Sequence, residues 1–163
     1  MGFAFECEMT PHVLKFLRSR GFLTSCQIWC GGWGICDIVA ARFGLGVKRN
    51  IPECESLMAL ELKLDDVAGV MNQCRQNKAV VNSACAVMPR SRINRMRAGT
   101  VTSFDIEGIA LLAVDDETGE CQWCVEPEHS LPHSGWEDAH EKLVRKMWRY
   151  VRREYHAAKM GQT

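Results

Sequence analysis

Three charged residues interrupt or end apolar segments of this 163-residue chain. Asp37 lies within the apolar run 35–39, and Glu61 and Lys63 end a second run that begins at Leu57. A carboxylate in such surroundings is costly unless it is paired with a cation or hydrogen-bonded. The residue types therefore favour one of two arrangements: a local ion pair of Lys63 with Asp37 or Glu61, or a metal-dependent site built from all three.

The chemistry of the second arrangement is phosphoryl transfer. Alternation along a strand places Glu61 and Lys63 on one face, with Leu60 and Leu62 on the other. Two carboxylate oxygens and a strand carbonyl suit Mg²⁺, a hard cation that keeps several waters and binds a phosphate oxygen. The lysine would orient or help to deprotonate a water for in-line attack on phosphorus. Acid-x-Lys triplets arise by chance in a chain of this composition, so the placement of this one in a strand carries the hypothesis.

The elements that would bring these residues together follow from hydrophobic spacing and turn residues. A helix is expected from Thr10 to Gly21, strands over 24–30 and 35–43 joined by a turn at Gly31-Gly32, a loop over 44–55 and a strand over 57–62. Asp65-Asp66 open another helix, followed by strands over 84–88, 106–114 and 121–125. A long helix is expected over about 135–158, with Trp136, Leu143, Met147, Val151 and Tyr155 on one side. The order predicts a single α/β domain over 1–163, with a mixed sheet flanked by helices and a C-terminal helix.

The pattern of Asp37 followed by Glu61-Leu62-Lys63 at the end of the next strand resembles the PD-(D/E)XK nuclease superfamily. The helix that carries 73–77, the strand at 84–89 and the later strand at 108–114 are similar in order to elements of these nucleases. The resemblance covers roughly residues 10–125. It implies a restriction-endonuclease-like fold and Mg²⁺-dependent hydrolysis of phosphodiester bonds in nucleic acid, with Mn²⁺ as a substitute metal.

Roles for individual residues follow from the resemblance by position. Asp37 and Glu61 would be metal ligands, Lys63 the catalytic lysine, and Gln73 the glutamine that some branches carry on the following helix. Two departures stand out. Cys36 occupies the position of the proline in the motif's name, and the acidic ligand often supplied by the first helix has no clear counterpart, since Glu6 and Glu8 precede that helix.

Basic residues are concentrated in two places. Residues 79–104 contain no acid, and Arg90, Arg92, Arg95 and Arg97 could bind phosphates there or could lie in a solvated loop. The terminal helix carries Arg145, Lys146, Arg149, Arg152 and Arg153, for which a charged outer face over core packing is the favoured interpretation. Trp29 and Trp33 flank the Gly-Gly turn, and we expect them in the core rather than exposed for base stacking.

A competing metal hypothesis rests on Cys121, Cys124, His129 and His133, whose residue types suit Zn²⁺. The gap between the two pairs is much shorter than in ordinary zinc fingers. If 121–125 is a regular strand, its two cysteines point to opposite faces. Zinc is therefore disfavoured, although a zinc-stabilised interaction module stays an alternative to the nuclease.

Composition and net charge exclude several classes of protein. The 20 basic and 20 acidic residues cancel, which excludes indiscriminate electrostatic coating of nucleic acid but not a local basic patch. The 47% apolar content excludes wholesale disorder, and no apolar run approaches a membrane span. An odd number of cysteines and an N-terminus unlike a signal peptide predict a reducing, cytoplasmic location.

The expected partner is nucleic acid, with DNA favoured and RNA left open, and no interaction with a membrane is expected. A homodimer and a catalytically inactive nucleic-acid- or protein-binding member of the fold also stay open.

Overall fold

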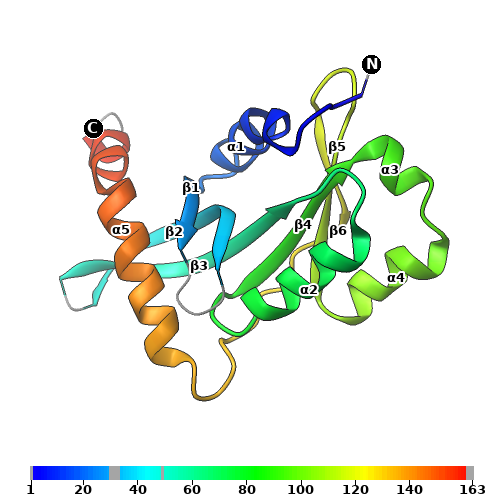
Figure 1. Ribbon diagram of the computed structural model, residues 1–163. Coiled ribbons are helices and arrows are strands. Elements are labelled where there is room, and N and C mark those ends of the chain that lie inside the picture. Colours follow the sequence, from blue (N-terminus) through cyan, green and yellow to red (C-terminus); the bar gives the residue numbers. More distant parts are fainter. Residues whose placement is uncertain (1, 30–33, 49, 161–163) are drawn as a thin grey trace.

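The structure is a computed structural model that describes residues 2–29, 34–48 and 50–160. Within these residues a six-stranded mixed sheet is flanked by helices (Figure 1), which confirms the predicted α/β class. The elements in chain order are η1 (Glu6–Glu8), α1 (Thr10–Arg18), β1 (Leu23–Trp29), β2 (Ile35–Lys48), β3 (Ile51–Leu62), α2 (Val67–Asn77), β4 (Ser83–Pro89), α3 (Arg90–Asn94), α4 (Ala98–Ile106), β5 (Ile109–Val114), β6 (Cys121–Val125) and α5 (Glu137–Met160).

The strands lie in the sheet in the same order as in the chain. β1, β2 and β3 form an antiparallel meander, β4 and β5 run parallel to β3, and β6 returns antiparallel to β5. Each parallel step requires a crossover, which α2 supplies between β3 and β4, and α3 with α4 between β4 and β5. The expected strands at 84–88 and 121–125 are confirmed, whereas β5 begins at Ile109 because α4 extends to Ile106.

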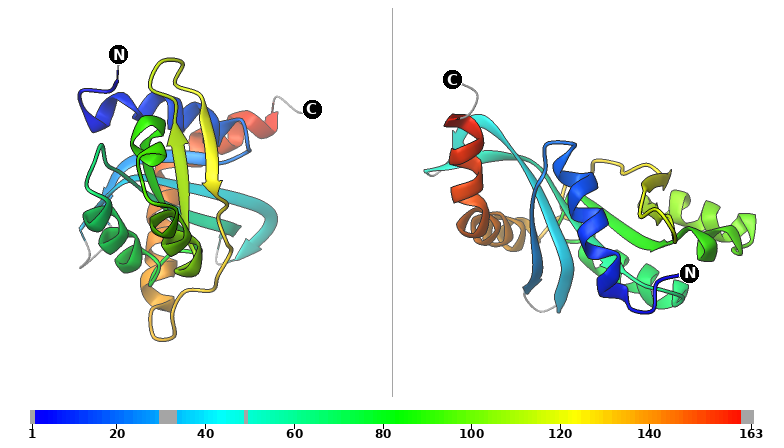
Figure 2. Two further views of the ribbon diagram at one scale, coloured as in Figure 1. Left: turned by 90° about the vertical axis from the view of Figure 1, so that its right-hand side faces the viewer. Right: turned by 90° about the horizontal axis from the view of Figure 1, so that it is seen from above.

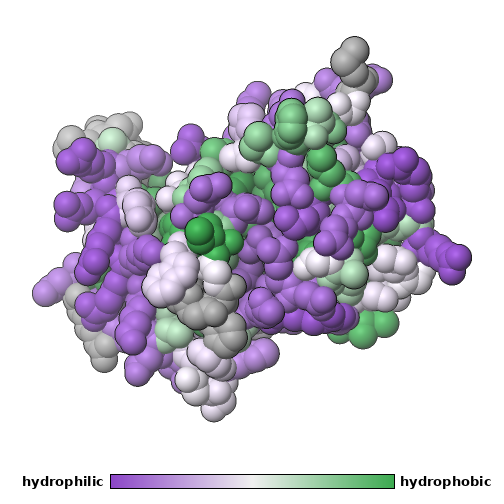
Figure 3. Space-filling model, viewed as in Figure 1, coloured by the Kyte–Doolittle hydropathy of each residue, from purple (hydrophilic) through white to green (hydrophobic). Residues whose placement is uncertain are grey.

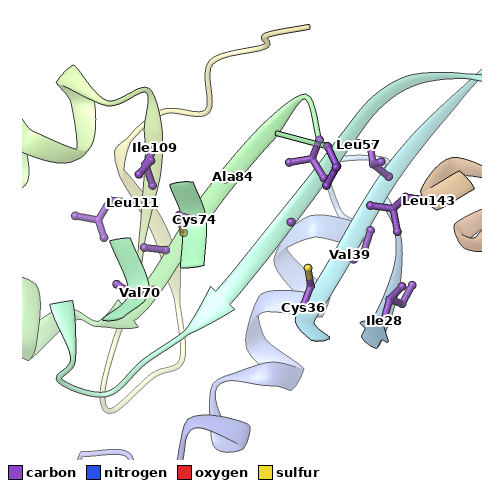
Figure 4. Close-up of a cluster of buried hydrophobic side chains, with 14 of the residues drawn as sticks. Ile28, Cys36, Val39, Leu57, Val70, Cys74, Ala84, Ile109, Leu111 and Leu143 are labelled. Carbon is purple, nitrogen blue, oxygen red and sulfur yellow. The ribbon is translucent and has the colours of Figure 1, made fainter. Parts of the chain in front are cut away.

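Apolar side chains cover both faces of the sheet, and helices close each face (Figure 2). On one face, Val70 and Cys74 of α2 and Leu143 of α5 pack over a cluster that includes Val39 and Leu57 (Figure 4). The other face is covered by the buried Met9 together with Val13 and Leu17 of α1, against residues such as Ile38, Leu60 and Val87. The predicted buried side of α5 is confirmed for Leu143, Met147 and Val151, while Trp136 at its start is 36% exposed.

The predicted loop over 44–55 is wrong, because β2 and β3 continue as a paired arm, here called the β2–β3 arm (residues 43–48 and 51–54). The pairing reaches Lys48 opposite Ile51, with register shifts around Phe43. The arm packs on α5 through edge-on contacts of Phe43 with Trp148 and Tyr155, and the Tyr155 hydroxyl donates a hydrogen bond to the Gly44 carbonyl at 3.1 Å. At Gly44 a side chain would collide with the Glu55 carboxylate, so glycines that suggested a loop instead allow close cross-strand packing.

The segment after β4, which carries Arg90, Arg92, Arg95 and Arg97, forms the helices α3 and α4. The expectation left open a solvated loop for these arginines. α3 follows Pro89, and α4 is anchored by Phe104, which is fully buried. Phe104 is the single buried side chain of α4, so the sequence lacks the repeating apolar face that signals a helix.

Smaller expectations have mixed outcomes. Asp66 caps α2, since its carboxylate accepts a hydrogen bond from the Gly69 backbone N–H at 2.8 Å. Met9 rather than Thr10 is the N-cap residue of α1. The expected turn at Gly31-Gly32 lies outside the described residues, as does Trp33.

The eight cysteines in the described ranges are free thiols, and Cys36, Cys74 and Cys85 are buried. No helix within these ranges is long and apolar enough to cross a membrane.

Candidate active site

The two predicted carboxylates meet where β2 and β3 separate. Regular pairing of these strands ends at Ile38 opposite Leu60, and the same register places Asp37 opposite Glu61. Asp37 Oδ2 accepts a hydrogen bond from the Leu62 backbone N–H at 2.8 Å. The side chain of Asp37 thus takes the place of a strand carbonyl and holds the carboxylate between the diverging strands.

Glu61 is one of the few buried charged or polar residues, with 3% of its surface exposed. Its Oε1 accepts a hydrogen bond from the Asn77 side-chain amide at 2.7 Å. The pKa of Glu61 is raised to about 7, mainly by burial and also by the nearby Asp37 charge and a hydrogen bond with Asp37, while Asn77 and Lys63 oppose the shift. The two carboxyl groups therefore interact directly, and near neutral pH a proton is readily gained or lost at Glu61.

Asn77 is a residue of the site that the sequence did not reveal. It is buried at the end of α2, and besides its bond to Glu61 it accepts a hydrogen bond from the Cys36 thiol at 3.6 Å. One amide thereby connects β2, β3 and α2. The available signal was a polar residue three positions after Cys74, on the apolar face of the predicted helix.

Lys63 immediately follows β3, and its backbone N–H continues the parallel ladder by donating to the Val87 carbonyl at 3.0 Å. Its Nζ forms an ion pair with Glu6 Oε2 at 3.2 Å. Lys63 therefore does form an ion pair, but with Glu6 and not with Asp37 or Glu61 as the sequence suggested. Of the two acids before α1, Glu6 reaches the site, whereas Glu8 accepts hydrogen bonds from the backbone N–H groups of Ala4 and Phe5.

A surface hollow of about 720 Å³ opens beside Asp37. It is lined by Glu6, Cys7, Thr10, Pro11, Leu14, Cys26, Gln27, Asp37 and Leu62. Gln27 lies opposite Asp37 between two register pairs of β1 and β2, and its φ of 52° is in the left-handed region. This conformation costs a non-glycine residue about 1–3 kcal/mol, a kind of strain that is concentrated at functional sites.

Gln73 lies one helical turn before Asn77 on the same face of α2. Its Oε1 is buried and has no hydrogen-bond partner in the part of the chain that the structure describes. The structure therefore brings Glu6, Asp37, Glu61, Lys63 and Asn77 into one connected group, and it leaves Gln73 beside that group with an unused acceptor.

The four candidate phosphate-binding arginines divide into two pairs. Arg90 lies 3.6 Å from Asp115, and Arg92 forms an ion pair with Asp65. Arg95 and Arg97 are exposed and form no ion pair within the described ranges. The second pair is thus the one available for a phosphate.

The candidate zinc ligands are not arranged for chelation. Exposed and half-buried residues alternate along β6, with Cys121 half-buried and Cys124 exposed, although the pairing with β5 shifts register beside Cys124. The two cysteines therefore lie on different faces of the strand. Nowhere in the described residues do three or more His, Cys, Asp or Glu side chains form a group that could hold a metal ion. A cation bound by Asp37 and Glu61 would have two carboxylate ligands and would complete its coordination shell with water or substrate. Mg²⁺ is commonly bound in this way.

Comparisons with known proteins define the fold alone. Neither a known protein family nor a curated protein matches the sequence. A solved structure of a protein of unknown function from Silicibacter pomeroyi is similar, with a TM-score of 0.60 and 10% identity over 94% of this chain and 90% of that chain. The chain thus shares its α/β architecture, over nearly its whole length, with a protein of unknown function.

Proposed function

We propose that this chain is a Mg²⁺-dependent nuclease with a restriction-endonuclease-like core, which hydrolyses phosphodiester bonds of nucleic acid, DNA being the expected substrate. One observation carries the proposal: Asp37 and Glu61 interact directly where β2 and β3 diverge. The order of strands and helices, and the placement of Lys63 next to the pair, agree with the resemblance found in the sequence.

The donor set fits a hard divalent cation. The charged form of Glu61 is poorly solvated, as its raised pKa indicates, and a divalent cation would supply the missing counter-charge. Asp37 lines the hollow and Glu61 lies opposite it in the register, so one oxygen from each would coordinate a shared ion whose other positions are filled by water and phosphate. When bound there, Mg²⁺ would polarise a phosphate oxygen and stabilise the charge that develops on it.

The other residues of the site would position the water, the metal ligands and the substrate. Lys63 orients the attacking water by donating a hydrogen bond to it, since its ammonium group lies at the same strand end as the carboxylates. Glu6 fixes the position of the Lys63 ammonium group through their ion pair. Asn77 orients the Glu61 carboxylate, and Gln73 offers a free acceptor one turn away. Arg95 and Arg97 supply cations for the flanking phosphates.

The test is a cleavage assay with single- and double-stranded DNA and RNA in Mg²⁺ or Mn²⁺. We expect metal-dependent cleavage that falls at least about 100-fold in Asp37→Asn. Asp105→Asn, which changes an exposed aspartate on α4, is the matched control and should cleave like the wild type. A wild type that cleaves none of these substrates, or an Asp37→Asn variant with undiminished cleavage, would overturn the proposal.

A second candidate is a non-catalytic nucleic-acid-binding protein on the same fold. The observation that favours it is the Lys63–Glu6 ion pair, which occupies the lysine that would otherwise act on water. Such a protein would bind nucleic acid in a salt-sensitive manner that depends on Arg95 and Arg97, and would show no turnover in any metal. Glu6→Gln frees the lysine, and an appearance of cleavage in this variant alone would point to a latent enzyme.

A further inference from the structure

Two large apolar side chains are exposed at the end of the β1–β2 pair. Trp29 is 59% exposed and Ile35 is 57% exposed, and the two lie opposite each other in the register. The expectation that Trp29 belongs to the core is therefore wrong. An exposed tryptophan beside an exposed isoleucine at a fixed strand position forms a small apolar platform, and an exposed indole is a surface on which a base can stack.

The platform borders a basic face of α5. The Lys146 ammonium donates a hydrogen bond to the Trp29 carbonyl at 2.9 Å and lies 5.6 Å from the centroid of the Trp29 ring. Helical spacing continues this face through Arg149, Tyr150 and Arg153, all of them exposed. From Lys142 to Arg153 the helix carries six basic residues and no acid. In Figure 3 hydrophilic side chains cover α5, and a small apolar patch shows beside them.

The platform also lies close to the candidate active site. Trp29 follows Gln27 by two residues, and Ile35 precedes Asp37 by two. At a strand rise of roughly 3.3 Å per residue, the exposed pair is only about 7 Å further along the strands than the hollow at Asp37. α5 packs on one face of the sheet and the hollow lies on the face that α1 covers, so the exposed pair at the strand ends lies between the basic helix and the carboxylates.

We propose that Trp29, Ile35 and the basic face of α5 bind a single nucleic-acid strand and guide it to Asp37 and Glu61. Bases stack on Trp29 and Tyr150, and phosphates contact Lys146, Arg149 and Arg153. A single strand fits better than a duplex, because paired bases already stack on both sides and leave no face for the indole. The inference rests on the proposed function, since it names the substrate class of that site.

Binding is measured without cleavage, by fluorescence anisotropy of labelled dT12, U12 and a duplex of equal length in EDTA. We expect both single strands to bind more tightly than the duplex, and the tighter of the two identifies the sugar that is preferred. Trp29→Ala should weaken single-strand binding by about 5- to 100-fold, as expected for the loss of one stacked base, while Trp29→Phe should retain most of it. Lys146→Ala should lower the slope of log affinity against log salt by about 0.7.

Trp136→Ala serves as the matched control, because it removes a tryptophan at the start of α5, outside the basic face, and should leave binding unchanged. Duplex binding equal to or tighter than single-strand binding, or wild-type affinity in Trp29→Ala, overturns the inference. The two proposals fail separately. Trp29-dependent binding without any cleavage in Mg²⁺ refutes the nuclease and leaves the strand-binding surface intact. Metal-dependent cleavage together with unchanged single-strand affinity in Trp29→Ala refutes the strand-binding surface and leaves the nuclease proposal intact.

Discussion

The centre of the sheet and the junction of β2 and β3 are built on opposite principles. Every residue of β4 and β5 is buried, and neither strand carries a charged side chain. At the β2–β3 junction, by contrast, a glutamate is buried against an aspartate, and a non-glycine residue adopts a left-handed backbone conformation opposite that aspartate. The apolar centre therefore stabilises the fold, whereas the junction contains charged and strained groups that folding alone does not favour. Such groups are commonly retained for function.

The largest expected effect is on activity and falls at the junction. Lys63→Ala should lower the rate of cleavage by about 10²-fold, because it removes the group that orients the attacking water. The free energy of unfolding should change by less than about 1 kcal/mol, since the lysine loses one partly exposed ion pair. Cleavage kinetics and urea unfolding of the same preparation check both parts. A loss of stability that accounts for the loss of activity would contradict this separation.

The central strands should show the reverse pattern. Leu111→Ala leaves a cavity at a fully buried position and should lower the free energy of unfolding by about 2–5 kcal/mol. Cleavage per folded molecule should stay close to that of the wild type. Leu131→Ala, at a side chain that is 81% exposed, is the control and should change stability by less than about 0.5 kcal/mol. Denaturant unfolding measures both variants.

Glu61→Gln should lower activity and raise stability above neutral pH. Because the pKa of Glu61 is raised from 4.5 to about 7, the folded state binds its proton more tightly than the unfolded state. The resulting stabilisation is complete below pH 4.5 and is lost as the pH rises through 7, a total of about 3 kcal/mol. Glutamine keeps an acceptor for Asn77 and has no charge, so the variant should lack this decrease. Parallel pH profiles of unfolding for the two proteins would show that Glu61 is not held as described.

Asn77→Ala should have a smaller effect on stability. It removes the amide that donates to Glu61 and leaves that buried carboxylate with one partner fewer, at a cost of about 1–3 kcal/mol. Because Asn77 lowers the pKa of Glu61, the decrease of stability with pH should move to higher pH in the variant. Urea unfolding at several pH values measures both effects. An unshifted pH profile would mean that the amide does not govern this carboxyl group.

The smallest effect is expected at the other edge of the sheet. Cys124→Ser changes an exposed side chain that points away from Cys121, so stability should change by less than about 0.5 kcal/mol. Elemental analysis of the purified wild type should find no stoichiometric zinc. One zinc per chain that is lost in Cys124→Ser would restore the zinc alternative.

Sequence patterns predicted the elements whose signals are local. The apolar runs of β4 and β5, the Asp66 cap and the apolar side of α5 each follow from neighbouring residues. The β2–β3 arm was missed because its glycines resemble loop residues, although they serve close packing against Glu53 and Glu55. α4 was missed because a single residue anchors it. These features depend on contacts between distant segments, which periodicity does not encode.

The candidate site was predictable to a similar degree. Asp37, Glu61 and Lys63 were found because charges within apolar runs are conspicuous in a sequence. Asn77 and the ion pair of Glu6 were not, since each acts across the fold, with the Lys63–Glu6 bond spanning 57 residues. The exposure of Trp29 was misjudged for the same reason, because no local pattern shows that its strand ends beside α5.

The central claim is that Asp37 and Glu61 together hold a divalent cation. Calorimetric titration of Mn²⁺ into the wild type, Asp37→Asn, Glu61→Gln and the Asp105→Asn control tests it most directly. We predict one strongly bound ion per chain in the wild type and in Asp105→Asn, and loss of that ion in both junction variants. Unchanged Mn²⁺ binding in Asp37→Asn, or no binding by the wild type, would contradict the claim.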